Sequence, residues 1–469
     1  MESWHKARSR NFKKKETGVF HDPAAESDPE TIFTMNASKS GRRSLGYLST
    51  VSIGIGGMVG GGIFAVLGLA VQLAQGGTPV AFLLAGAVAL LTSYSYAHLS
   101  IAYPSQGGTV EFMNKAFGPG LITGTLNLLL WLSYVVMLSL YAHAFGSYGA
   151  SLFGPAHQTF LKHIFVTGIV FVFTALNVSG AQVVGRTEKI VVGLKLAILL
   201  LFVTVGLLSV DLGRLAPSTW SHPLKLLAGG MIIFLAYEGF ELIANTAADI
   251  REPRKTLPRA YYSSVLFVIA LYILVSAVTV GNLSTDKIAA ARDYALAESA
   301  RPFLGTLGFL LIAVAALLST SSAINATLYG AARISYCIAR DGELPAFLEK
   351  KIWNRPVEGL LITSVFTLLL ANLFDLSSIS IMGSGGFLII FAAVNLCNLR
   401  LHKVTASNVY LCGLGVVVCM GALTALLWQT TLSSPHDIWV LATMIVSALT
   451  IETIYRRITG RTILLSARR

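Results

Sequence analysis

The chemistry suggested by this chain begins with a glycine-rich segment that interrupts an apolar run. Six of the nine residues from Gly54 to Gly62 are glycine, and apolar sequence extends around them from about residue 45 to residue 75. Each interior glycine destabilises a helix by about 0.5–1 kcal/mol relative to alanine, so a helix is expected to break here. The half-helix that follows Gly60, Gly61 and Gly62 would begin with free N–H groups, which suit an anionic group such as a carboxylate. Close helix packing through small-xxx-small pairs is the alternative interpretation, although it requires fewer glycines.

A second apolar span carries two carboxylates. Glu238 and Glu241 are three residues apart, on one face of any helix that continues there, and Gly239 between them allows the backbone to open. Acidic side chains inside a membrane are costly to expose to lipid and are functional by default. Opened backbone carbonyls and a carboxylate would together accept an ammonium group. A structural hydrogen bond to a neighbouring helix is the alternative interpretation for either residue.

Lys195 is the basic residue that we place inside a predicted span. If its helix starts at Lys189, the long side chain could extend to the membrane interface. If the helix starts deeper, the amine is buried, its neutral form is favoured, and it could take up and release a proton. Position alone leaves both alternatives open.

Hydroxyl groups cluster on a later, long span at residues 319–322, beginning with Ser319 and Thr320. They could coordinate Na⁺ or accept a hydrogen bond from Lys195, although Ser and Thr in membrane helices usually bond to their own backbone. Four aromatic side chains could close a pocket over a solute or simply pack the helices: Tyr134, Phe234, Tyr237 and Phe387.

These residues require membrane-spanning helices to position them. Of the 469 residues, 54% are hydrophobic and 12% are charged, and the mean hydropathy is +0.68; soluble domains carry about 25% charged residues. Apolar runs of about 20 residues can cross a ~30 Å hydrocarbon core. We therefore predict an all-α integral membrane protein with about twelve spans, near residues 46–75, 79–103, 121–153, 159–178, 189–210, 224–248, 257–282, 302–338, 357–373, 377–400, 409–430 and 435–456.

The net charge of +12 indicates membrane topology rather than nucleic-acid binding. With a cytoplasmic N-terminus, most of the 35 Lys and Arg residues fall on the cytoplasmic side, as the positive-inside rule requires. We predict a multi-pass protein of the cell membrane with both termini cytoplasmic and residues 1–43 forming a disordered tail. Loops are short, and clustered His, Asp or Cys residues at a membrane face are absent from the sequence, so we expect no enzyme, organic cofactor or metal site.

The first five spans and the next five each begin with an interrupted helix. Matching interruptions in two halves are typical of an inverted-repeat transporter site, and five spans per half give the halves opposite orientations. We predict a ten-helix core over residues 44–400, composed of repeats at about 44–210 and 224–400, with discontinuous helices 1 and 6. Residues 401–469 would add two transmembrane helices and a short cytoplasmic tail.

Several motifs resemble the amino acid-polyamine-organocation (APC) superfamily of permeases. They are GGMVGGGIF at 56–64, FLAYEGFE at 234–241 with AADIREPRKTLPR at 247–259, and YPSQGG at 103–108, and together they cover the first ten spans. The resemblance implies a LeuT-like fold, in which substrate is held between the unwound centres of helices 1 and 6 while outer and inner gates alternate.

By position, the resemblance assigns carboxylate binding to Gly60, Gly61 and Gly62, and backbone contacts with an ammonium group to Ala236, Tyr237 and Gly239. It relates Glu241 to an acidic residue used in substrate handling or gating, and Lys195 to a lysine that replaces the second sodium in proton-coupled members. Two departures weaken the transfer of an inner-gate charge network: Ala248 stands where many members have an acidic residue, and His98 stands where many have glutamate. His98 could itself titrate near neutral pH.

We therefore predict a secondary active transporter that imports an amino acid by alternating access, with H⁺ as the coupling ion and Na⁺ as the alternative. Proton coupling is predicted at Lys195, Ser319, Thr320 and His98, and the gate or polar wall of the site at Glu238, Glu241, Tyr134 and Phe234. An amino acid or polyamine exchanger is the alternative function, followed by a non-transporting nutrient sensor. The expected partners are the amino acid and the lipid bilayer, without nucleic acid, and the oligomeric state stays open.

Overall fold

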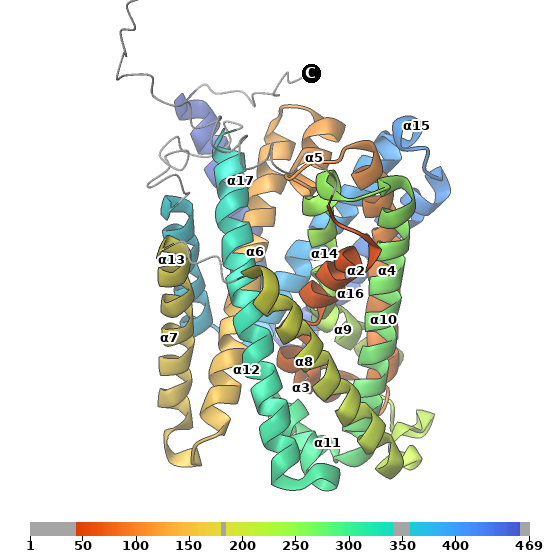
Figure 1. The fold of residues 1–469 in the computed structure, drawn as a ribbon, viewed down its shortest axis with the longest axis vertical. Helices are drawn as coiled ribbons and strands as arrows, with labels where there is room; N and C mark the ends of the chain where they lie inside the picture. The colour runs from red at the N-terminus through yellow and green to blue at the C-terminus, as the bar shows by residue number, and fades with distance from the viewer. Residues whose placement is uncertain (1–43, 180–183, 341–356, 460–469) are drawn as a thin grey trace, which may run out of the picture. The chain divides into compact units, whose positions relative to one another are not determined.

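The computed structural model describes residues 44–179, 184–340 and 357–459, and the regular elements within these ranges are helices (Figure 1). Two isolated backbone bridges, Leu45 with Ile250 and Gln75 with Trp220, supplement them. The predicted all-α class is therefore confirmed.

The helices follow the chain in the predicted order. The first part contains α2 (Tyr47–Met58), α3 (Gly62–Ala74), α4 (Thr78–Ala102), α5 (Thr109–Phe117), α6 (Leu121–Ser151), α7 (Gln158–Ser179) and α8 (Val184–Gly206). The second part contains α9 (Pro223–Ile232), the 3₁₀ segments η5 (Ile233–Tyr237) and η6 (Phe240–Asp249), α10 (Pro253–Asn282), α11 (Thr285–Ala290), η7 (Arg292–Tyr294), α12 (Ala295–Arg340), α13 (Val357–Leu373) and α14 (Leu376–Arg400). The short α15 (His402–Thr405) leads to α16 (Val409–Ser433) and α17 (Pro435–Thr459), and further 3₁₀ turns are Pro155–His157, Leu207–Ser209, Leu212–Leu215 and Pro217–Thr219.

The number of membrane spans agrees with the sequence prediction. Within the described ranges, ten helical segments are long and apolar enough to cross a membrane, and the bent pair α2 and α3 meets the same test as one broken span. α13 is also apolar, and its 17 residues lie at the lower limit for a spanning helix. The prediction of about twelve spans is confirmed. α12 begins at Ala295, but its backbone leaves helical geometry at Gly305, where φ is 62° and ψ is −154°, so two helices meet there, close to the predicted start of the eighth span at residue 302.

Two of the spans are broken where the sequence concentrates glycine. α2 ends at Met58 and α3 begins at Gly62, with a bend of 47° between them. The sixth span leaves α-helical geometry after Ile232, continues as η5, and becomes extended at Glu238, where ψ is 146°. Gly239 then adopts φ 121°, a backbone conformation that favours glycine because other residues would bring Cβ into collision.

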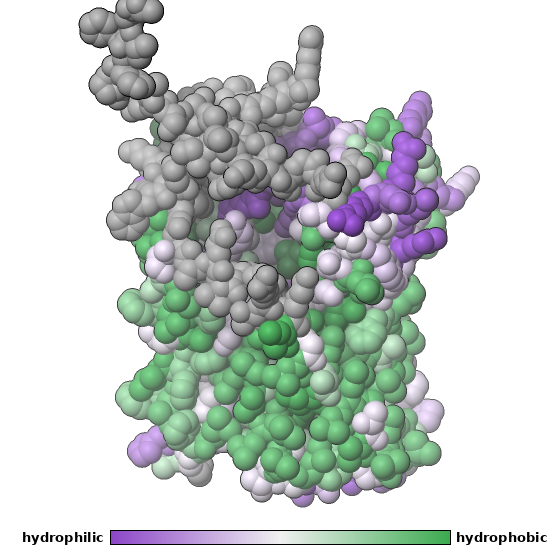
Figure 2. Space-filling model, viewed as in Figure 1, coloured by the Kyte–Doolittle hydropathy of each residue, from purple (hydrophilic) through white to green (hydrophobic). Residues whose placement is uncertain are grey.

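The surface fits a lipid environment. In Figure 2 hydrophobic residues cover most of the visible face, and hydrophilic residues gather at the end where α5 and α15 lie in Figure 1. Phe171 and Leu208 are 70% and 88% exposed, which is unfavourable in water and favourable in hydrocarbon. Inside the bundle α4 packs along α10 and α6 packs along α12, so these four helices surround the broken spans.

Candidate functional site

The two helix interruptions touch each other through glycine. A Cβ atom added to Gly57 would lie 2.7 Å from the carbonyl oxygen of Gly239, and one added to Gly62 would lie 2.7 Å from Cα of Ala236. Real Cβ atoms do not approach other atoms this closely, so both positions require glycine to let one backbone meet the other. The structure thus brings the two predicted substrate-binding segments into direct contact.

The first interruption presents backbone donors. The first hydrogen bond of the α3 ladder runs from Ala65 N to Gly61 O at 3.0 Å, so the N–H groups of Gly62, Ile63 and Phe64 precede the ladder and have no acceptor within the helix. Gly61 has no side chain to cap them. With the positive end of the helix dipole, these N–H groups form an environment that suits an anion.

The second interruption is organised by Glu241. One carboxylate oxygen accepts a hydrogen bond from Gly239 N at 2.7 Å, and the other accepts from the Tyr134 hydroxyl at 3.2 Å. Glu241 and Glu238 are both buried, 1% and 3% exposed. The backbone opens at Gly239 between them, so the two residues are not on one continuous helix. The Glu241 carboxylate fixes the start of η6 and ties it to α6.

Tyr272 joins the two interruptions and was not identified from the sequence. Its hydroxyl, on α10, donates to Met58 O at 2.7 Å and lies 3.2 Å from Ala236 O, so it reaches the last carbonyl of α2 and a carbonyl near the end of η5. The side chain is fully buried. Its only sequence signal is a single hydroxyl within an otherwise apolar stretch, which does not distinguish it from a packing aromatic.

Lys195 lies at the C-terminal end of α2. Its side chain is 1% exposed, and Nζ donates to the Gly56 carbonyl oxygen at 3.1 Å. Of the two alternatives left open by the sequence, the structure therefore shows a buried amine. Ser319 of α12 also serves this end of α2, since its hydroxyl donates to Val59 O at 2.9 Å and also contacts Gly60 O. Carbonyls released by the break in helix 1 are thus bonded by Lys195 on α8 and by Ser319 on α12.

The region that carries both interruptions matches a known protein family. A family model described as "Amino acid permease" matches residues 45–449. The chain belongs to the amino acid permease family. The permease is 38% identical over 424 residues to the uncharacterized protein MJ0609 of Methanocaldococcus jannaschii, with 90% of this chain and 97% of the relative covered.

Other relatives of the permease are described as transporters. It is 33% identical to the inner membrane transport protein YbaT of Escherichia coli, with 87% of this chain and 95% of the relative covered. It is 24% identical to the branched-chain amino acid permease BcaP of Bacillus subtilis, with 86% and 92% covered. Membership of the APC superfamily, expected from the sequence motifs, is therefore confirmed.

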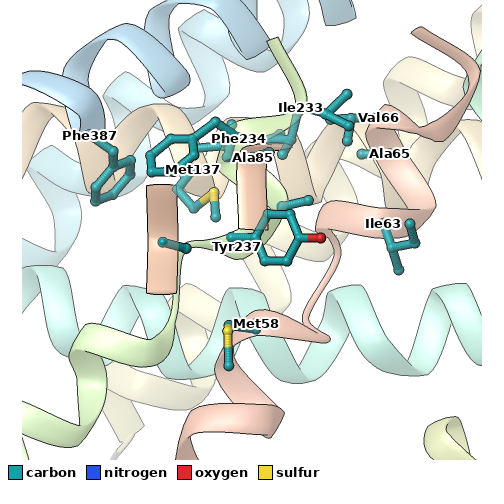
Figure 3. Close-up of a cluster of buried hydrophobic side chains, with 14 of the residues drawn as sticks. Met58, Ile63, Ala65, Val66, Ala85, Met137, Ile233, Phe234, Tyr237 and Phe387 are labelled. Atoms are coloured by element: carbon teal, nitrogen blue, oxygen red, sulfur yellow. The ribbon is translucent and has the colours of Figure 1, made fainter. Parts of the chain in front are cut away.

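Aromatic side chains of the permease surround the interruptions. Figure 3 shows Phe234, Tyr237 and Phe387 in one buried cluster. The Tyr237 hydroxyl donates to Phe82 O of α4 at 2.8 Å, so its side chain is anchored to α4 while its backbone stays at the break. The rings of Tyr134 and Phe387 meet edge to face with centroids 5.8 Å apart. These side chains pack the wall on the side of α4, α6 and α14.

The other two residues predicted for proton coupling bond elsewhere. The Thr320 hydroxyl donates to Ala316 O of its own helix at 2.7 Å, the usual arrangement for Thr in a membrane helix. His98 lies near the end of α4, where Nδ1 is 3.0 Å from Thr405 O and the ring packs at a tilt against Tyr94, with centroids 4.4 Å apart. The structure therefore groups Ser319 with Lys195 at the end of α2, and places His98 beside α15.

A charged cluster lies at the opposite end of the permease, beside α3. Asp293 of η7 accepts hydrogen bonds from Lys162 Nζ at 2.8 Å and from the Ser147 hydroxyl at 3.3 Å, and its Oδ2 is 3.3 Å from His143 Nε2. η7 also packs directly on α3, where a Cβ on Gly68 would collide with the backbone of the loop. The cluster thereby fixes the segment that covers this end of α3 to helices α6 and α7.

Proposed function

We propose that the permease is a secondary active transporter that imports an amino acid together with a proton. An α-amino acid carries a carboxylate and an ammonium group on one carbon, and the two touching interruptions offer partners for both. The free N–H groups at the start of α3 suit the carboxylate, and the carbonyls at Ala236, Tyr237 and Gly239 suit the ammonium group. Side chains around them would select among amino acids.

The observation that carries proton coupling is the buried contact of Lys195 Nζ with Gly56 O. Burial disfavours the charged form of an amine, whereas the carbonyl dipoles at the end of α2 favour it. In the proposed cycle this amine binds a proton while it contacts α2 and releases it when α2 moves away. Because the contact involves the helix that forms half of the substrate site, protonation and substrate binding act on the same element.

The proposed orientation places both termini on the cytoplasmic side of the cell membrane. It is supported by the excess of Lys and Arg in the segments assigned to that side. The basic residues Arg251, Lys255 and Arg259 near the start of α10 and Arg456 and Arg457 at the end of α17 belong to this set.

Uptake by purified permease in proteoliposomes tests the proposal. A thermal-shift screen of the twenty amino acids and common polyamines first identifies a stabilising ligand, because a ligand that binds the folded state stabilises it by mass action. With the radiolabelled ligand outside, an inside-alkaline pH gradient should drive accumulation, and an ionophore that collapses the gradient should abolish it. Replacing Na⁺ by choline should have no effect.

The Lys195→Gln variant then locates the coupling. It should lose gradient-driven accumulation while retaining counterflow exchange, whereas the matched control Lys115→Gln, on the surface helix α5, should behave as wild type. Accumulation that survives both the ionophore and the Lys195 substitution would exclude proton coupling at this residue. Counterflow without gradient-driven uptake in the wild-type protein would instead identify an exchanger. Ligand binding without any transport of the ligand would identify a sensor.

A further inference from the structure

A serine of α14 bridges the interrupted backbone of the sixth span. The Ser384 hydroxyl donates to Ile232 O at 2.8 Å and accepts from Leu235 N at 3.2 Å, and the residue is fully buried. These two backbone groups are three residues apart, which is the spacing that a 3₁₀ turn pairs. In a regular α-helix each group would pair with a partner four residues away instead, Ile232 O with Ala236 N. The hydroxyl therefore bonds to both ends of the turn at which α9 passes into η5, and it favours this turn over a continued α-helix.

This contact is uncommon for a serine in a membrane helix, because such hydroxyls usually bond to their own backbone. Ser380, one turn earlier on α14, follows the usual pattern and donates to Leu376 O at 2.6 Å, whereas Ser384 reaches a different helix. α14 also comes close at the neighbouring position, where a Cβ added to Gly383 would lie 2.6 Å from the Leu235 side chain. Two adjacent residues of α14 thus contact Leu235, Ser384 at its N–H group and Gly383 at its side chain.

The other half of the chain has a comparable contact. α8 and α14 are the last spans of the two predicted repeats, and each bonds to the backbone of the broken first span in its own repeat. Lys195 of α8 donates to Gly56 O of α2, and Ser384 of α14 donates to Ile232 O at the end of α9. The two contacts differ in chemistry, because a buried amine can gain or lose a proton whereas a serine hydroxyl does not titrate. The contact at the sixth span is therefore independent of proton binding.

We propose that Ser384 is a positioning residue of the substrate site and keeps η5 unwound. The unwound turn leaves the carbonyl groups of Ala236 and Tyr237 outside the α-helical pattern, and these carbonyls are the proposed partners of the substrate's ammonium group. Without the hydroxyl, η5 can fluctuate between the 3₁₀ turn and a continued α-helix, in which both carbonyls would turn toward N–H groups of their own span. The inference rests on the proposed amino acid site, although the conformation of η5 can be measured without any ligand.

Ligand binding to the purified full chain tests this role with two probes: the amino acid that gives the largest shift in the thermal-shift screen, and the same molecule without its amino group. Ser384→Ala should weaken binding of the amino acid by about tenfold, as expected for the loss of one buried hydrogen bond, and should leave binding of the desamino acid unchanged. The matched control Ser380→Ala removes a buried hydroxyl that bonds within α14, and should leave both affinities unchanged. Because a general loss of stability would weaken both probes alike, the ratio of the two affinities separates positioning from a structural role.

Hydrogen exchange of the backbone amides at residues 232–238 gives a second measurement without ligand. Ser384→Ala should accelerate exchange there by about tenfold, because the turn loses a bond that opposes its opening, and Ser380→Ala should not. Equal weakening of the two probes by Ser384→Ala, or the same exchange rate in the two variants, would overturn the positioning role. If none of the twenty amino acids binds the wild-type chain, the proposed function fails, and faster exchange in Ser384→Ala alone would still show that the hydroxyl holds η5.

Discussion

Replacing Tyr272 by phenylalanine should weaken the link between the two helix interruptions while preserving the packing around them. The substitution removes only the hydroxyl that donates to Met58 O and lies near Ala236 O. The ring keeps its contacts with Phe82 and Tyr237, whose centroids are 5.6 Å and 5.2 Å away. The variant therefore isolates the hydrogen bond from the volume of the side chain.

The magnitude follows from the burial of this group. Tyr272 is fully buried, so the Met58 carbonyl that loses its donor is not rescued by bulk water. Leaving a buried acceptor unsatisfied costs about 1–3 kcal/mol. If this cost falls on the conformation that binds substrate, the affinity for the amino acid should decrease by about 5- to 150-fold.

The assay compares ligand affinity and uptake rate with thermal stability. Tyr261→Phe is the matched control, because it removes another fully buried hydroxyl from the same helix, one that bonds to Ser100 at 3.0 Å rather than to the carbonyls of Met58 and Ala236. Both variants should unfold at lower temperature, but only Tyr272→Phe should lose affinity. Equal affinities in the two variants would show that the Tyr272 hydroxyl stabilises the bundle without organising the site.

Two further substitutions test the junction of the two interruptions and the charged cluster beside α3. Gly57→Ala should abolish uptake and lower the unfolding temperature, because its Cβ would lie 2.7 Å from the carbonyl oxygen of Gly239. Gly413→Ala is the control and should leave uptake unchanged, because a Cβ added there meets no neighbouring element within 4 Å. Asp293→Asn should lower the unfolding temperature and accelerate opening of the segment over α3, measured by hydrogen exchange, because it weakens the 2.8 Å ion pair with Lys162. Asp286→Asn on α11 is its control, and equal exchange in the two variants would contradict the assigned role of the ion pair.

The helices were predictable because the length of each apolar run and the position of its glycines determine where a membrane helix forms and where it breaks. A run of about 20 apolar residues has few alternatives to spanning the membrane. The interruption at Gly60 to Gly62 and the turn at Gly239 were also predictable, because few other residues tolerate such close backbone contact or a φ of 121°. The short helix before Gly305 was harder to predict, because Pro302 and Gly305 mark the boundary at which the backbone leaves helical geometry and the residues before them show no apolar run of spanning length.

The side-chain partners of the site were less predictable, because rotation about a helix axis is not encoded in apolar spacing. Lys195 was consistent with either a buried or an interfacial amine until its contact with Gly56 O was seen. For Glu241 the sequence left open an ammonium ligand or a structural hydrogen bond to a neighbouring helix, and the structure shows its carboxylate bonded to Gly239 N and the Tyr134 hydroxyl. Tyr272 was missed because its importance arises from two carbonyls that are distant in sequence.

The contacts between α2 and η6 limit how this protein can move. The two segments are joined at one end by the backbone bonds of Leu45 with Asp249 and Arg251, and at the other by the contact of Gly57 with Gly239. An outward movement of α2 alone would break these two main-chain hydrogen bonds. It would also separate Gly57 from Gly239, where neither residue has a side chain that could occupy the space left between them. α2 and η6 should therefore move together as one rigid unit, with the hinge at the two glycine turns.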